Sequence, residues 1–500
     1  MAISTAIDNS ARARTVGIKT QFKDLRPAGT SFVPQRIALI GQGNSASTYA
    51  TTKRSITSSN EAATLYGFGS PIHEAAKQLF PASGDGVGAI PVTVYPLDAG
   101  GAAVAALGDV VATGTATRQF TGRLRIGGVL SDEFVIPSGT LAAAVGTLLN
   151  TAINDVLDMP VSSVVNVGTD GVDLTAKWLG ETGNDVLIEI DAPTDAGITF
   201  AITPMATGAV APDVQVALVQ IGDIWETLIV NAAVPYTDTT TLDEFSVYGE
   251  GRFDPLVRKP LVAFTGTFET VLATLQAAGD ARRTDRTNVL LSVPGSTSTP
   301  WAIAARAASR VVRIADNNPA RDYGRATLTG IVTGTDAEQW TYTQRDLLIK
   351  AGIATTQVRD GVSELSDTVT FFHPLGETDP AYRFVKEIVK LQQVIFNTNL
   401  IFDTAEWDGA PLIPDDQPTT NRDARKPKAA VAAVNRMIDS LGLAAIISDP
   451  ATAKTRTLAG INISNPNRLD VSMTVQLSGN ANIRSIDLDF GFFFGTLPTV

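Results

Sequence analysis

The chain has 500 residues, 44% of them hydrophobic, with 51 acidic against 39 basic side chains for a net charge of −12. This length predicts about two to four globular domains, and the acidic balance argues against wrapping duplex nucleic acid, which needs a basic surface. The absence of cysteine excludes disulfides, thiolate metal sites and thiol nucleophiles. Since there is neither a signal-peptide pattern nor a run of about 18 apolar residues, we expect a soluble protein made in the cytoplasm, with no membrane span.

The first 30 residues have too little apolar surface for a core and predict an extended arm. A short alternation within them has the period of a strand, and it comprises Val16, Ile18, Thr20 and Phe22. A strand this short needs a partner sheet to be stable. The arm is therefore either a strand that pairs with another sheet or a flexible segment.

A strand predicted over 35–40 runs into a glycine-rich turn from Gly41 to Ala46. The turn matches the dinucleotide fingerprint G-x-G-x-x-G/A. The residues that follow, 47–54, have no helical apolar face, and we expect no second strand ending in an acidic residue to close a βαβ unit. We interpret the turn as structural and keep nucleotide binding as the alternative. A helix over 71–80 and a strand over 90–95 come next.

From residue 97 to 208 the composition shifts to Gly, Ala, Thr and Asp. One helix over 141–157 is expected among short strands at 117–126, 132–136, 161–167, 172–178 and 186–190. Insertions are best tolerated at the surface, so this segment predicts a small α+β domain inserted on the outside.

From residue 212 to 356, apolar runs alternate with helical segments. Strands are predicted at 227–230, 261–264 and 289–293, and helices at 239–250, 267–278 and 300–316. This alternation is typical of a mainly parallel sheet with helices on both faces.

The last third begins with two amphipathic helices, over 382–402 and 427–441. Two alternating segments then predict a hairpin, and their apolar members are Val471, Met473 and Val475 in the first and Ile486, Leu488 and Phe490 in the second. An aromatic run over 491–495 follows. An apolar chain end requires a docking surface, which lies either in the same subunit or in a neighbouring copy that accepts a lent strand.

Residues suited to catalysis or metal binding are scarce. His73 has Lys77 where a zincin helix needs its second histidine, and His373 stands alone. No lysine follows a glycine, which excludes a Walker-type phosphate loop, and Asp415 and Asp416 lie between prolines in an expected solvated loop. We expect no catalytic, cofactor-binding or metal site, and no enzyme activity.

Four cations lie within seven positions of this acidic chain: Arg422, Arg425, Lys426 and Lys428. They form either a solvated approach to the helix that follows or a contact for an acidic partner surface.

The order of these features resembles the tail sheath proteins of contractile phages, most closely the Mu-like sheaths. The resemblance rests on the arm segment Arg14 to Ile18, the strand Arg36 to Gly43, the segment Glu61 to Pro71, the inserted module with the α/β region after it, and the closing Val471 to Gly495. No single segment is a strict motif, so the match lies in their order along nearly the whole chain.

The resemblance implies a multidomain α/β and α+β protein whose α/β sheath domain is subtilisin-like but lacks peptidase function. The implied divisions are an N-terminal linking arm over 1–30, a first part of the sheath domain over 31–96, an inserted outer α+β domain over 97–208, the subtilisin-like α/β part over 209–360, and a C-terminal tube-facing assembly domain with a terminal strand arm over 361–500.

The resemblance further implies a structural subunit of the virion tail, assembled in the host cytoplasm without direct nucleic acid contact. Stacked hexameric rings would surround a tail tube and contract to drive it through the host envelope for genome ejection. Implied partners are further copies, the tail tube protein, against which the basic run would lie, and baseplate and tail terminator proteins. The strands exchanged between copies would include the arm alternation Val16 to Phe22 and both C-terminal alternations, with Val471, Met473 and Val475 in the first and Ile486, Leu488 and Phe490 in the second. The alternatives are a nucleotide-binding enzyme that uses Gly41 and Gly43, and a static capsid or surface-layer protein.

Overall fold

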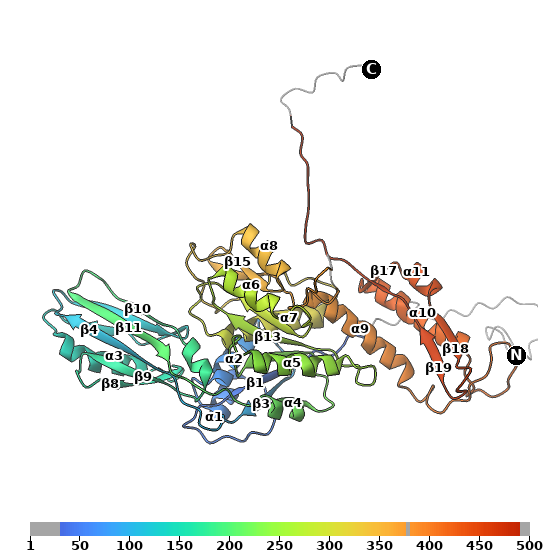
Figure 1. Ribbon diagram of the computed structural model, residues 1–500, viewed down its shortest axis with the longest axis horizontal. Helices are drawn as coiled ribbons and strands as arrows, with labels where there is room; N and C mark the ends of the chain where they lie inside the picture. Colours follow the sequence, from blue (N-terminus) through green and yellow to red (C-terminus); the bar gives the residue numbers. More distant parts are fainter. Residues whose placement is uncertain (1–30, 377–380, 491–500) are drawn as a thin grey trace, which may run out of the picture.

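The computed structural model describes residues 31–376 and 381–490. Three regions follow one another along its long axis: the inserted sheets, a central sheet with its helices, and a C-terminal region around α10 (Figure 1). The predicted mixed α/β architecture with several modules is confirmed.

The central sheet has eight strands in the order β2-β3-β1-β12-β13-β14-β15-β16. The six inner strands are parallel, and β2 and β16 join antiparallel at the edges. The parallel sheet predicted for this region is therefore confirmed. The strand bounds are β1 (Ile37–Gln42), β2 (Arg54–Ile56), β3 (Val92–Leu97), β12 (Leu228–Ala232), β13 (Val262–Thr267), β14 (Asn288–Ser292), β15 (Ala354–Arg359) and β16 (Val362–Asp367).

Helices cover both faces of this sheet, which explains the continuous apolar runs of its strands. Within β1, Ile37 and Leu39 belong to one core, whereas Ala38 and Ile40 belong to the core on the opposite face. The first core includes residues of α1 (Ser59–Tyr66), α2 (Pro71–Leu79) and α7 (Pro300–Asn317), and the second includes residues of α4 (Gln215–Ile221) and α5 (Thr239–Arg252). A further cluster joins α6 (Leu272–Asp280) and α8 (Tyr342–Lys350) to β14.

The segment between β3 and α4 forms two four-stranded sheets packed with α3 (Val145–Asn154). One sheet contains β4 (Leu107–Gly114), β8 (Val161–Val165), β9 (Gly171–Ala176) and β11 (Ile198–Ala206). The other contains β5 (Phe120–Ile126), β6 (Val129–Leu130), β7 (Phe134–Ile136) and β10 (Ile188–Asp191). The sequence prediction missed β4 and β11, because their glycine, alanine and threonine residues weaken the apolar alternation.

The C-terminal region contains the two predicted helices, α9 (Val385–Phe402) and α10 (Pro427–Leu443), and a short α11 (Pro450–Thr455). Two small antiparallel sheets lie against α10, and they pair β17 (Ile447–Ser448) with β20 (Gln476–Leu477) and β18 (Leu458–Ile461) with β19 (Leu469–Ser472). The predicted hairpin between the segments around 473 and 488 is wrong, because the first pairs with β17 and β18 and residues 481–490 form no strand.

Candidate assembly surfaces

The glycine turn after β1 uses its own amides within the fold. The amide of Asn44 donates to the Tyr66 carbonyl at 2.7 Å and that of Ser45 donates to the Lys177 carbonyl at 2.8 Å. A side chain at Gly43 would lie 2.4 Å from the Tyr49 ring, so close packing explains the glycine. Phosphate binding at such a turn needs outward-facing amides and a helix N-terminus. Residues 43–53 contain no helix, and the geometry therefore supports the structural interpretation.

One expectation about this turn is wrong. β3 runs parallel to β1, is reached through α1 and α2, and is followed by Asp98, so a βαβ crossover does close. The sequence pattern concealed it because the helices begin only at Ser59, well after the turn.

The two histidines have local structural contacts. His73 Nδ1 accepts a hydrogen bond from the Gly69 amide at 3.1 Å, and burial lowers the pKa of His73 to about 4. His373 contacts the Phe371 carbonyl at 2.7 Å and Asp280 at 3.2 Å. In residues 31–376 and 381–490, neither imidazole bonds a serine or threonine hydroxyl. The same residues contain no cluster of three or more His, Cys, Asp or Glu side chains suited to a metal ion, and no helix long and apolar enough to cross a membrane.

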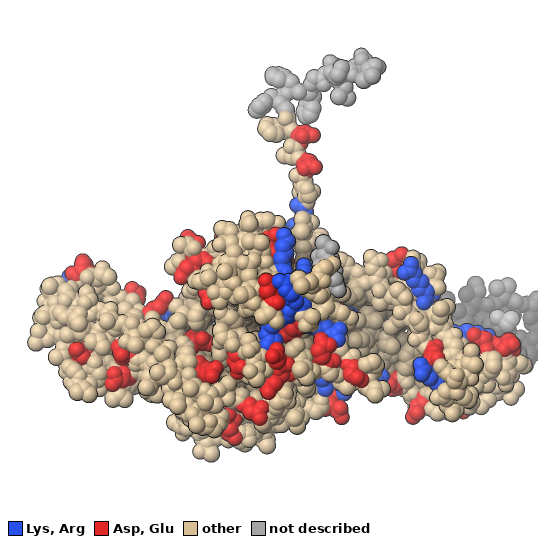
Figure 2. Space-filling view, in the orientation of Figure 1, with Lys and Arg blue, Asp and Glu red and all other residues tan. Residues whose placement is uncertain are grey.

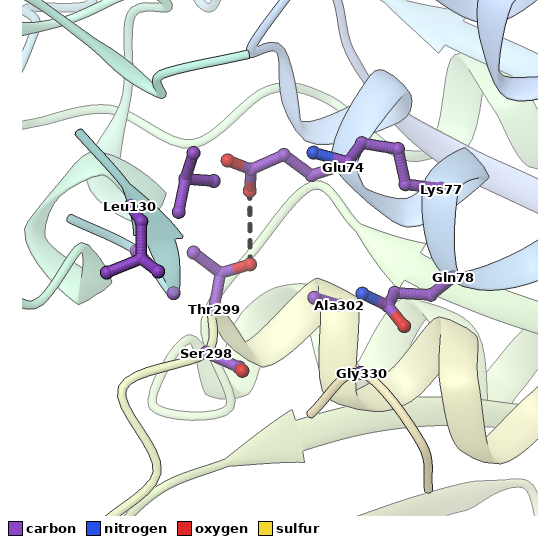
Figure 3. A pocket seen from close by; sticks show the side chains of 11 residues that line it. Glu74, Lys77, Gln78, Leu130, Ser298, Thr299, Ala302 and Gly330 are labelled. Carbon is purple, nitrogen blue, oxygen red and sulfur yellow. Dashed lines mark hydrogen bonds between the residues drawn. The ribbon is translucent and has the colours of Figure 1, made fainter. Parts of the chain in front are cut away.

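A cavity of about 300 Å³ lies where the insertion meets the central region (Figure 3). It is lined by α2, the turn between β5 and β6, and the start of α7. The Glu74 carboxyl is buried there, and it accepts hydrogen bonds from Thr299 Oγ1 at 3.1 Å and Trp301 Nε1 at 2.6 Å. Burial raises the pKa of Glu74 to about 8, which leaves the group mainly protonated at neutral pH. Glu74 was not predicted from the sequence, although a glutamate within a largely buried helix was the available signal.

Other contacts identify this cavity as part of a joint between the two regions. Lys77 on α2 pairs with Asp158 of the insertion at 2.6 Å. Trp178 of the insertion packs edge-on against Trp301 of α7, with 5.4 Å between ring centroids. The cavity is therefore bounded by contacts that hold the insertion on the central region.

The first C-terminal alternation is used within the subunit. Val471, Met473, Val475 and Leu477 pack, partly buried, on a cluster that includes Val434 and Leu441 of α10. The intervening Ser472, Thr474 and Gln476 are exposed. Among the described residues, no third strand pairs with either edge of the β18–β19 sheet.

The second alternation is held out in solvent. Residues 481–490 leave the subunit as an extended tail, which stands clear of the remaining surface (Figures 1 and 2). The exposed fractions of Ile483, Ile486 and Leu488 are 88%, 84% and 80%. Phe490 is exposed as well. The predicted strand residues Val16, Ile18, Thr20 and Phe22 lie outside the described residues.

The basic run before α10 divides into cations that hold a loop and cations that face solvent. Arg425 pairs with Glu406 at 3.4 Å, and the Lys426 ammonium donates to the carbonyls of Asp415 and Gln417. Arg422 is exposed, and Lys428 is exposed although its ammonium also reaches the Asp415 carbonyl at 3.2 Å. Part of the run thus fixes the loop that packs before α10.

No family model matches the chain. The Mu-like prophage FluMu tail sheath protein of Haemophilus influenzae is 28% identical over 341 residues, which cover 66% of this chain and 67% of that protein. The predicted resemblance to Mu-like tail sheath proteins is confirmed.

Solved structures of sheath proteins also align with this chain. The sheath tail protein of Desulfitobacterium hafniense is 11% identical with a TM-score of 0.46, and the alignment covers 92% of this chain and 100% of that protein. The sheath tail protein of Listeria innocua is 12% identical with a TM-score of 0.47, with coverages of 91% and 94%. Both TM-scores lie below 0.5, so the similarity to tail sheath proteins rests on the sequence identity with the Haemophilus protein.

Proposed function

We propose that this chain is a structural subunit of a contractile tail sheath and that it polymerises by lending its terminal segments to neighbouring copies. The observation that carries the proposal is the tail, whose residues 481–489 have the alternation of a strand but no strand partner among the described residues. An extended segment of this kind adds to an open sheet edge through backbone hydrogen bonds, and alternate side chains then fill one face.

The β18–β19 sheet is the proposed acceptor. It contains only two strands, and a two-stranded sheet is marginally stable in water unless more strands or a helix support it. α10 supports one face, while both strand edges remain open to further strands among the described residues. A lent strand would complete this sheet and bury apolar side chains that an isolated subunit leaves exposed.

The finer architecture is part of the same proposal. A subtilisin-like, non-peptidase part within the central region is supported by the parallel sheet with helices on both faces and by the local bonding of both histidines. The division into an arm over 1–30, sheath segments over 31–96 and 209–360, an outer insertion over 97–208 and an assembly domain over 361–500 belongs to it, although the central sheet itself continues to Asp367.

The proposed assembly is a helical stack of hexameric rings in the virion tail, around a tail tube and between baseplate and terminator proteins. Contraction would reorient rigid subunits while the lent strands act as tethers. The exposed Arg422 and Lys428 are the members of the basic run best placed to contact the tube, with Arg425 and Lys426 supporting the loop beside them. Weak, exposed ion pairs suit a contact that must release during contraction.

Electron microscopy of the purified polymer tests this function. A contractile sheath predicts two discrete polymer lengths with unchanged subunit cores. A single length under all conditions that trigger contraction would instead identify a static lattice, and refolded cores would contradict the rigid-body mechanism.

A further inference from the structure

Helix α9 carries a row of buried polar side chains. Lys390 and Gln393 are fully buried, and the exposed fraction of Asn397 is 9%. Their spacing of three and four residues places them on one face of the helix, over roughly 10 Å of its length. Buried polar groups require hydrogen-bond partners, so the partners of this row show what the face holds.

Lys390 holds the root of the C-terminal tail. Its ammonium donates to the Ser478 carbonyl at 2.6 Å and to Asn480 Oδ1 at 2.7 Å. The Asn480 amide nitrogen in turn donates to the Ala320 carbonyl at 2.9 Å. From residue 481 onward every described residue of the tail is exposed, so Asn480 marks the end of the anchored segment.

Gln393 and Asn397 hold the other end of the described chain. Gln393 Oε1 accepts a hydrogen bond from the Val33 amide at 2.8 Å, and Asn397 Nδ2 donates to the Ser31 carbonyl at 3.0 Å. Val33 is buried, and Phe32 packs against the α10 cluster. Residues 31–33 are therefore fixed on α9 directly before they lead into β1.

The Lys390 contacts are costly to break. Burial and the neighbouring Lys386 lower the pKa of Lys390, and no carboxylate among the described residues lies within ion-pair distance of it. Its partners are therefore a carbonyl and an amide oxygen of the tail root. If the root left, a buried ammonium would lose these acceptors, which is strongly unfavourable.

We propose that α9 is a shared anchor for both terminal arms, with Lys390 fixing the C-terminal root and Gln393 and Asn397 fixing the N-terminal root. This role rests on the proposed function, in which the arms are tethers between subunits. The C-terminal root is also bonded to β17 and to the Ala320 carbonyl, but α9 is the element that both roots share, so a load on either arm reaches the same helix. The two tethers thereby keep a fixed spacing while subunits reorient.

Hydrogen exchange on the unassembled full-length protein tests the anchor. Asn480→Ala removes one of the two acceptors of Lys390 and should speed exchange of residues 476–480 at least tenfold, and Lys390→Met should do the same. Gln393→Met should speed exchange of residues 31–35 by a similar factor. Matched controls on the same helix are Gln392→Met, whose amide donates to the Pro260 carbonyl, and Lys386→Met, whose ammonium pairs with Asp322. The exchange rates of residues 31–35 and 476–480 should be unchanged in both control proteins.

Unchanged exchange at the roots in the Asn480→Ala and Gln393→Met proteins would overturn the anchor, as would equal acceleration in the two controls. If Lys390→Met fails to fold, Asn480→Ala is compared with Asn480→Asp, which keeps the acceptor of Lys390 and loses only the donor to the Ala320 carbonyl. Equal acceleration in these two proteins would overturn the anchor at the C-terminal root. Sedimentation of the polymer is a separate readout. The two readouts can therefore disagree. If exchange at the roots changes as expected but the protein still polymerises without its arms, the anchor is supported and strand lending is rejected.

Discussion

Two segments of the C-terminal region share one sequence pattern and have opposite environments. Residues 471–477 place their apolar members against α10, whereas residues 483–490 present equally apolar members to solvent. An alternation of period two therefore specifies a strand with one apolar face but does not specify the sheet that covers that face. Under the proposed function, the first segment stabilises the subunit and the second stabilises the polymer.

The largest effect is expected from a backbone change in the tail. Leu488→Pro should abolish polymer formation and leave the melting midpoint of the subunit unchanged, because proline removes a donor from a paired strand, whereas Leu488 is 80% exposed in the isolated subunit. Leu488→Ala is the control, since it keeps the backbone donor and should weaken polymerisation only partly. Polymer yield by sedimentation measures both, and a normal yield from the proline variant would contradict strand pairing at this position.

A matched pair of isoleucines sharpens the comparison. Ile447 in β17 is buried, and Ile447→Ala should lower the free energy of unfolding by about 3 kcal/mol, because it leaves a cavity beside α10. Ile486 is 84% exposed, and Ile486→Ala should change the same quantity by less than about 0.5 kcal/mol. Denaturant unfolding of the unassembled proteins provides the test. Equal losses would mean that the tail also folds onto its own subunit.

A pH titration separates the central region from the tail. Glu74 has a pKa near 8 in the folded protein, above its ordinary 4.5, so the folded state retains a proton that the unfolded state loses, and stability falls as pH rises from 4.5 to 8. Glu74→Gln should remove this loss, which we expect to be about 2 kcal/mol after structural relaxation. His73, with its pKa lowered to about 4, acts oppositely, and stability falls as pH drops from 6.5 to 4.

Unfolding at pH 5, 7 and 9 measures these contributions. The Glu74→Gln protein should have a flatter profile between pH 5 and 9 than the parent protein, whereas Leu488→Ala should retain the parent profile. Parallel profiles for the Glu74→Gln and parent proteins would show that Glu74 is ionised in the folded state.

The smallest effect concerns the basic run. Arg422→Glu with Lys428→Glu should weaken co-assembly with tail tube, because exposed ion pairs contribute about 0 to 1 kcal/mol each and are screened by salt. Polymerisation without tube should continue. Arg425→Glu is the contrasting change, since it breaks the pair with Glu406 inside the subunit and should destabilise the loop before α10. If the double variant attaches to the tube as well as the parent protein does at every salt concentration, the basic run does not face the tube.

The sequence predicted the central sheet well, because strands buried on both faces read as continuous apolar runs such as Ile37 to Ile40. It missed the hairpin of β15 and β16, although Asp360-Gly361, both with positive φ, is a strong signal for a two-residue turn. That omission concealed the continuation of the sheet past residue 360.

The assembly surfaces were less predictable. The pattern located the apolar tail around Leu488. Under the proposed function its partner belongs to another molecule, and a partner of that kind leaves no mark on the period of the sequence. Lys390 and Gln393 were not identified, because a buried lysine and an exposed one look alike on an amphipathic helix until their partners at Ser478 and Val33 are brought beside them.

Sedimentation and thermal unfolding of one sample that lacks residues 1–27 and 481–500 test strand lending most directly. The cores of the central region and of α10 lie within the retained residues. We therefore predict a folded subunit with the melting midpoint of the full-length protein and no polymer. Polymer formation equal to that of the full-length protein would contradict the account.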